Sequence, residues 1–146
     1  MRFALALVVI AACGGAGKHA ANGAGSGSGP ALYAKKMSVG WGLVADSGKT
    51  NVFLETTDET GRQTSYPVGS YPGDCRRITP APQLKAATGI TCSTTSDVVE
   101  VDAVIDNETV IVVREHYAPG AAPDPMAREE VTRVTAPGGS AIEVSP

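Results

Sequence analysis

The chain has 146 residues, with 12 Lys or Arg against 15 Asp or Glu, and its formal net charge at pH 7 is −3. This acidic balance excludes the electrostatic footprint of a nucleic-acid-binding protein or of a protein that binds an anionic lipid surface. Hydrophobic residues make up 42% of the chain, which is enough for one core, and the sequence suggests neither a cofactor nor a metal.

The chain begins with the residues MRFALALVVIAAC. Arg2 supplies a basic start, and residues 3–12 form an apolar run. Ten helical residues rise about 15 Å, which is half of the roughly 30 Å hydrocarbon core. The run is therefore too short for a lasting membrane span, and we predict a cleaved signal peptide over residues 1–12.

The sequence Ile10-Ala11-Ala12-Cys13 resembles the lipobox of bacterial lipoproteins. That resemblance implies a diacylglycerol on the sulfur of Cys13, cleavage before this residue, and acylation of the new amino terminus, for example with palmitate. Two or more acyl chains hold a protein firmly on a membrane. Because Gly14 and not aspartate follows the cysteine, analogy with the family indicates an outer-membrane lipoprotein in the cell envelope. The alternative is an ordinary secretory peptide with an incidental cysteine.

Residues 13–30 are expected to be the lipidated cysteine and a flexible tether. Seven of the seventeen residues in 14–30 are glycine. Such a segment buries too little apolar surface to offset its ordering entropy. The GxGxG run at 25–29 follows no predicted strand and lacks the Lys-Ser/Thr ending of a phosphate-binding loop.

Residues 31–146 are expected to form a single β domain, because Val, Thr, Ile and Tyr recur between closely spaced turn signals. The turn at 58–61 predicts a hairpin of 51–57 with 62–68, and the turn at 137–139 predicts a second hairpin of 129–135 with 141–145. Residues 118–127 are predicted to be a crossing loop, and one short helical turn is expected near 82–87. We predict an antiparallel β-sandwich or small barrel of about seven or eight strands.

A further hairpin is predicted over residues 98–117, and its register can be argued from charge. A three-residue loop at 106–108 sets Glu100 opposite Arg114, whereas a two-residue loop sets Glu100 opposite Glu115 and places Arg114 beside Val101. Cross-strand charge pairing and burial both favour the three-residue loop. In this register the apolar face consists of Val99, Val101, Ala103, Ile105, Ile111 and Val113.

Cys75 and Cys92 are the two cysteines of the domain. An even pair in an exported domain is typical of a disulfide. A metal would require more ligands of this kind, and a redox pair usually has the spacing Cys-x-x-Cys. We predict a structural disulfide between the two residues.

Three carboxylates, Asp97, Glu100 and Asp102, lie close together in the sequence. Glycosidases and aspartic proteases need paired carboxylates, so this group is a candidate for a small envelope hydrolase. A solvated strand face is the alternative interpretation, and the sequence favours it. The domain has one histidine, His116, and no G-x-S-x-G element.

A candidate binding surface is formed by aromatic and basic residues, because Tyr and Trp are common interface anchors. Its members are Trp41, Tyr66, Tyr71, Arg76 and Arg77. Packing of the aromatic rings against a sheet is the alternative, and the spacing favours it.

These observations predict a lipid-anchored, non-enzymatic binding or structural domain of the cell envelope. Its expected contacts are the membrane, through the lipid on Cys13, and an envelope protein or polysaccharide, with no nucleic acid. The alternatives are the small hydrolase described above and a periplasmic sensor or inhibitor that presents its Tyr-Pro segment.

Overall fold

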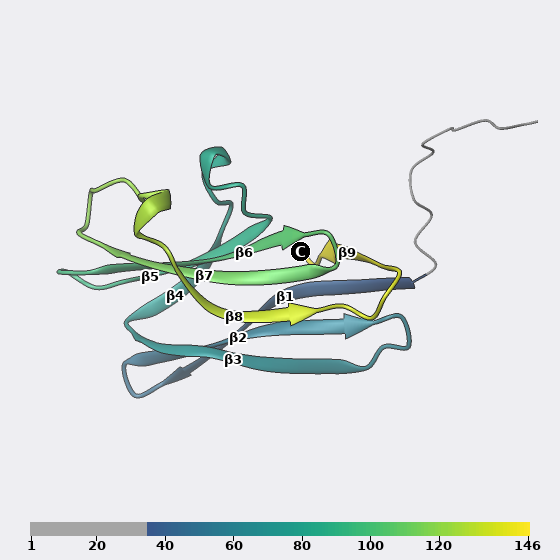
Figure 1. Cartoon of the computed structure of the whole chain (residues 1–146). Coiled ribbons are helices and arrows are strands. Elements are labelled where there is room, and N and C mark those ends of the chain that lie inside the picture. Colours follow the sequence, from purple (N-terminus) through teal and green to yellow (C-terminus); the bar gives the residue numbers. More distant parts are fainter. Residues whose placement is uncertain (1–34) are drawn as a thin grey trace, which may run out of the picture. The chain divides into compact units, whose positions relative to one another are not determined.

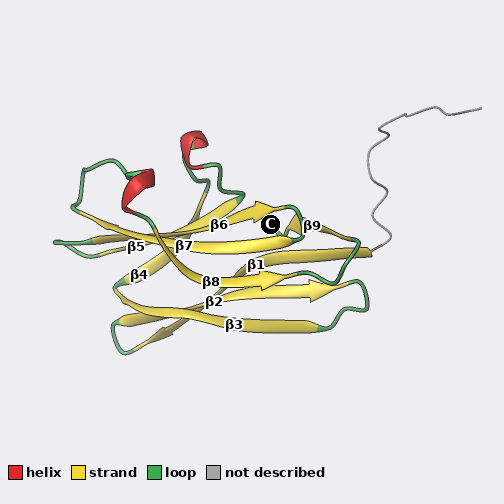
Figure 2. Cartoon of the chain, in the orientation of Figure 1, coloured by secondary structure: helices red, strands yellow, loops and turns green. Residues whose placement is uncertain are grey.

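The structure, a computed structural model, describes residues 35–146 and consists of two β-sheets (Figure 1). The predictions on residues 1–34, namely the signal peptide, lipidated Cys13 and the tether, lie outside the described residues. The two sheets pack face to face and two short helical turns lie beyond the upper sheet (Figure 2). The predicted all-β class is confirmed as a two-sheet sandwich.

The described residues form nine strands, where seven or eight were expected. In chain order the elements are β1 Lys35–Asp46, β2 Lys49–Asp58, β3 Gln63–Pro72, β4 Asp74–Ile78, η1 Pro82–Leu84, β5 Thr88–Ser93, β6 Val98–Asp106, β7 Thr109–Tyr117, η2 Pro125–Ala127, β8 Glu129–Thr135 and β9 Ser140–Val144.

One sheet has four strands in the order β3-β2-β1-β9, and the other has five in the order β4-β5-β6-β7-β8. Neighbouring strands run antiparallel except β1 and β9, which are parallel. The core lies between the sheets, as the alternation of buried residues along each strand requires. Its fully buried large side chains include Trp41, Leu54 and Val39 from one sheet and Ile90, Val101, Val110 and Val112 from the other.

The hairpin predicted around residues 58–61 is present as β2 and β3. The turn is stabilised by Asp58, whose Oδ1 accepts hydrogen bonds from the backbone N–H groups of Thr60 and Arg62. Gly61 has φ +82°, a left-handed conformation that glycine adopts without steric cost. The turn chemistry read from the sequence therefore positions these two strands correctly.

The second predicted hairpin, around residues 137–139, is wrong. Strands β8 and β9 lie at the predicted positions but in different sheets, and β9 pairs with β1. The turn carries the chain from one layer to the other. The Pro-rich segment also differs from its prediction, because it joins the antiparallel neighbours β7 and β8 without crossing between the sheets.

The predicted register of the β6–β7 hairpin is also wrong, by one residue. Asp106 pairs with Thr109, and Glu100 lies opposite Glu115. Asn107 takes φ +51°, which asparagine tolerates better than most residues, and this permits the two-residue loop. Two contacts replace the assumed pairing of Arg114 with Glu100: Arg114 bonds to Glu129 and lies 6.0 Å from the centre of the Tyr71 ring.

The predicted disulfide is confirmed. Cys75 in β4 lies directly opposite Cys92 in β5, and their sulfurs are bonded. The bond joins the edge strand β4 to its neighbour. Cys92 is buried in the core between the sheets.

Candidate functional site

The binding surface predicted from aromatic and basic residues does not form one surface. Trp41 and Tyr71 belong to the core and are 2% and 4% exposed, so the prediction is wrong for both. Each lies on the inward-facing side of its strand, where a large apolar side chain gains most from burial. The alternative interpretation, packing of the rings against the sheet, holds for these two residues.

The remaining three residues of that prediction are dispersed. Tyr66 lies in β3 and packs against the core. Arg77 donates from Nη2 to the carbonyl oxygen of Trp41 and from Nη1 to that of Pro146, both at 2.8 Å, so its guanidinium is occupied within the fold. Arg76 lies on the opposite side of β4 and lines a groove described below.

The three carboxylates of the predicted hydrolase site separate into two places. Asp97 precedes β6, and its Oδ2 lies 3.2 Å from Nδ1 of His116 at the surface. Glu100 and Asp102 both point from β6 to the outer face of the five-stranded sheet, which is the face turned away from the core. Although they lie on this outer face, they are 6% and 0% exposed. The solvated strand face favoured by the sequence is therefore wrong for these two residues.

Burial of the outer carboxylates comes from residues 118–128, which we call the covering segment. It follows β7 and returns across the outer face before β8 begins, and it carries η2 (Figure 1). Asp124 caps η2 by accepting a hydrogen bond from the N–H of Met126, and its own N–H donates to Glu115 Oε1 at 2.5 Å. These bonds fix the segment so that Arg128, at its end, enters the space above the sheet.

Arg128 lies at the centre of a buried group of charges. Its Nη2 is 2.6 Å from Asp102 Oδ2 and 3.4 Å from Glu100 Oε1, and its Nε is 3.5 Å from Glu115 Oε2. We call these four residues the carboxylate cluster. One guanidinium facing three buried carboxylates leaves the cluster short of positive charge, and such groups are costly to bury unless they are paired.

The electrostatic consequence appears at Asp102. Burial raises the pKa of its carboxyl from 3.8 to about 6, because it removes the charged form from water, and Arg128 offsets only part of this effect. The neighbouring Glu100 raises it further. The same strand pairing explains Gly89 in β5, since a Cβ at this position would collide with Oδ1 of Asp102.

Glu100 has a second partner, Tyr117, the last residue of β7. The Tyr117 hydroxyl donates to Glu100 Oε2 at 2.7 Å. Burial and the adjacent Glu100 carboxylate together raise the pKa of Tyr117, so its hydroxyl stays protonated and remains a donor at neutral pH. Glu100 is thus fixed from one side by Tyr117 and from the other by Arg128.

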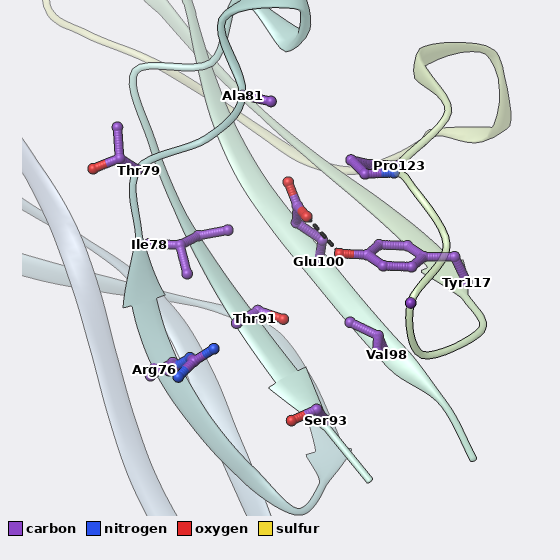
Figure 3. Close-up of a pocket in the computed structure, with 11 residues that line it drawn as sticks. Arg76, Ile78, Thr79, Ala81, Thr91, Ser93, Val98, Glu100, Tyr117 and Pro123 are labelled. Carbon is purple, nitrogen blue, oxygen red and sulfur yellow. Dashed lines mark hydrogen bonds between the residues drawn. The ribbon is translucent and has the colours of Figure 1, made fainter. Parts of the chain in front are cut away.

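An open groove of about 450 Å³ lies beside Glu100 (Figure 3). Its floor is the outer face of β5 and β6, with Arg76 and Ile78 of β4 on one side and Tyr117 and Pro123 on the other. We call it the outer groove. Its lining residues are Arg76, Ile78, Thr79, Ala81, Thr91, Ser93, Val98, Glu100, Tyr117, Gly120 and Pro123.

Strand register explains why these residues meet. Arg76, Thr91, Glu100 and Glu115 are successive partners across four adjacent strands, and Asp74, Ser93, Val98 and Tyr117 form the next row on the same face. Neighbouring strands lie about 4.8 Å apart, so Arg76 and Glu100 are separated by roughly two strand spacings. The sheet therefore holds the polar groups of the groove at fixed intervals.

Sequence reasoning missed Glu115, Tyr117 and Arg128. The two-residue form of the hairpin contained a signal for Glu115, because it sets Glu100 opposite Glu115 and thereby requires a cation between them. Arg128 follows eleven residues after Tyr117 in a segment of loop-like composition, and no local pattern links it to β6.

Among residues 35–146, no three His, Cys, Asp or Glu side chains are arranged to hold a metal ion. No helix in this part of the chain is long and apolar enough to cross a membrane. No family model matches the sequence, and no curated protein or solved structure is significantly similar to it.

Proposed function

We propose that the chain is a lipid-anchored, non-catalytic binding domain of the cell envelope and that the outer groove is its ligand site. The lipobox-like sequence ending at Cys13 supports the anchor and, with Gly14, an outer-membrane location. The groove supports the binding role, because its volume lies within the range of about 300–1,000 Å³ typical of small-molecule sites.

The observation that carries the proposal is the fixed carboxylate on the groove floor. Glu100 is 6% exposed, and both of its oxygens have partners, Tyr117 on Oε2 and Arg128 on Oε1. Each carboxylate oxygen can accept about two hydrogen bonds, so capacity remains on the side that faces the groove. An acceptor whose orientation is fixed before binding loses little entropy when a ligand binds.

The same geometry favours binding over hydrolysis. Retaining and inverting glycosidases both use two carboxyl groups that flank the scissile bond. Of the residues that line the outer groove, Glu100 alone has a carboxylate. Asp102 lies beneath Arg128 with no exposed surface, and Asp97 faces His116 instead of Glu100.

The sensor or inhibitor alternative depended on a Tyr-Pro loop presented to a partner. Residues 66–72 belong to strand β3, and Tyr71 is buried. This arrangement gives the alternative no exposed aromatic anchor at Tyr71, so we do not adopt it.

The anchor is tested by the mass of the N-terminal peptide from the membrane fraction, compared with a Cys13→Ser variant. We expect an acylated Cys13 in the wild type and release of the variant from the membrane. An unmodified terminus on a soluble protein would contradict the anchored part of the proposal.

The site is tested by photo-crosslinking in cells, with the photoreactive residue placed at Ser93 on the groove floor. Thr57, on the outer face of β2 in the other sheet, is the matched control position. We expect a crosslinked product at Ser93 and none at Thr57. Equal crosslinking at both positions, or none at Ser93, would contradict a binding role for the groove.

A further inference from the structure

The outer groove combines one positive and one negative residue with several hydroxyl groups. Arg76 and Glu100 are its only charged lining residues, and they lie on different strands with Thr91 between them. An anionic ligand would approach Glu100 and the other two carboxylates of the carboxylate cluster, and a cationic ligand would approach Arg76. This charge distribution favours a ligand that is polar but neutral.

The hydroxyl groups strengthen that argument. Thr79, Thr91 and Ser93 line the groove, and none of their hydroxyls bonds to another group within residues 35–146. A hydroxyl can both donate and accept. Directly opposite residues on neighbouring strands have Cβ atoms about 5 Å apart, and successive residues on one face of a strand lie about 7 Å apart. A small ion is too small to contact several of these groups at once, whereas an extended molecule with several hydroxyl groups can do so.

Apolar side chains complete the lining. Ile78 lies on the β4 side, Val98 on the floor and Pro123 on the opposite side, next to the ring of Tyr117 (Figure 3). A wholly apolar ligand would cover Glu100 and the hydroxyls without offering them partners, which is costly. A molecule that alternates hydroxyl groups with C–H surface satisfies both kinds of lining.

We propose that the outer groove binds a neutral saccharide, with Glu100 accepting hydrogen bonds from its hydroxyl groups and Arg76 donating to its oxygen atoms. Thr91 lies between these two charged ends and contacts the middle of the ligand, and Ser93, in the next row of the same face, contacts it from one side. Ile78, Val98 and Pro123 contact its C–H surface. This assignment rests on the proposed binding function and adds the chemical class of the ligand.

The test applies the processed full-length chain, purified in detergent, to three sets of immobilised oligosaccharides. The neutral set contains N-acetylglucosamine oligomers and linear glucans, the acidic set contains uronic acid oligomers, and the cationic set contains glucosamine oligomers. We expect retention on at least one neutral probe and little on the charged sets.

Two matched variants locate the binding. Thr91→Arg fills the groove floor, and Thr57→Arg places the same side chain on the outer face of the other sheet. We expect Thr91→Arg to weaken binding at least about tenfold and Thr57→Arg to leave it within about twofold. A Glu100→Gln variant, checked for an unchanged circular dichroism spectrum, should weaken binding in the same direction.

Retention on acidic or cationic probes alone would overturn the neutral-saccharide assignment, as would the absence of retention on all three sets. Equal loss in Thr91→Arg and Thr57→Arg would overturn the location. Crosslinking at Ser93 then separates the two proposals: a crosslinked product without saccharide retention leaves the binding function standing with another ligand, and no product refutes both.

Discussion

The two faces of strand β6 are both buried, but by different means. Val99, Val101 and Ala103 point inward and are covered by the opposite sheet. Glu100 and Asp102 point outward from the same strand and are covered by the segment that ends in Arg128. An alternation of apolar and charged residues therefore does not establish that the charged side meets water.

The first test of this difference between the faces places a carboxylate on the inner face. Ala103→Asp introduces on the inner face the side chain that its neighbour Asp102 carries on the outer face. Because Ala103 is fully buried and its cross-strand partners are Val112 and Thr88, no basic residue lies opposite the new carboxylate, and we expect a loss of more than about 4 kcal/mol of unfolding free energy, or failure to fold. Urea denaturation measures this loss, with Val144→Asp, at a site 40% exposed, as a control that changes stability by about 0.5 kcal/mol or less.

The second test of this difference removes the cation from the outer face. Arg128→Ala leaves three buried carboxylates without a counter-charge, and we expect a loss of about 3–5 kcal/mol in urea denaturation. Arg133→Ala removes an exposed arginine that pairs with Glu130, and it should leave the unfolding free energy close to that of the wild type. Similar losses in the two variants would show that the carboxylates of the cluster are solvated.

Gly89→Ala tests the packing of the outer face, because it crowds this face without changing its charge. The new Cβ would collide with the Asp102 carboxylate, so the group must move relative to Arg128. We expect a loss of about 1–3 kcal/mol, measured by thermal or urea unfolding. Gly138→Ala, at a position with open space around it, is the matched control and should be close to neutral.

An effect of comparable size is expected from the pH dependence that Asp102 contributes to stability. Its folded-state pKa of about 6 exceeds the ordinary value of 3.8, so the folded protein binds this proton more tightly than the unfolded chain does. The resulting stabilisation is fully present below about pH 4 and is lost as pH rises through 6. Relative to Asp102→Asn, the wild type should lose about 2 kcal/mol over this interval, and parallel stability profiles would contradict the assignment.

Local sequence signals were sufficient for much of the fold. The turn at residues 58–61 predicted the β2–β3 hairpin, and the even cysteine pair predicted the bond between Cys75 and Cys92. The alternation in residues 98–106 correctly assigned Val99, Val101 and Ala103 to the core face. Each of these features depends on residues close in sequence or on a strict period of two.

The errors arose where distant residues decide the outcome. The register of β6 and β7 was argued from the charge pair of Glu100 with Arg114, but Arg128 compensates Glu100 and Glu129 compensates Arg114. Both partners lie beyond β7, in the covering segment or at the start of β8. The place of β9 was missed for the same reason, since its partner β1 lies about one hundred residues earlier.

The candidate site was predicted only in part. Glu100, Asp102 and Arg76 were singled out from the sequence, but the first two, with Asp97, only as an alternative hydrolase site that the sequence disfavoured, and the third within a binding surface that the structure does not form. What joins Arg76 to Glu100 is the register across β4, β5 and β6, which no single segment contains. Tyr117 was assigned to a strand end without a role.

The burial of the carboxylates beneath residues 118–128 underlies both the comparison of the two faces and the fixed acceptor in the groove. The most direct measurement is the titration of the Asp102 side-chain carboxyl carbon by ¹³C nuclear magnetic resonance, assigned by comparison with Asp102→Asn. A midpoint near pH 6 is the expected result. A midpoint at or below the ordinary 3.8 would contradict the account, because burial under the covering segment would then not outweigh the pairing of Asp102 with Arg128.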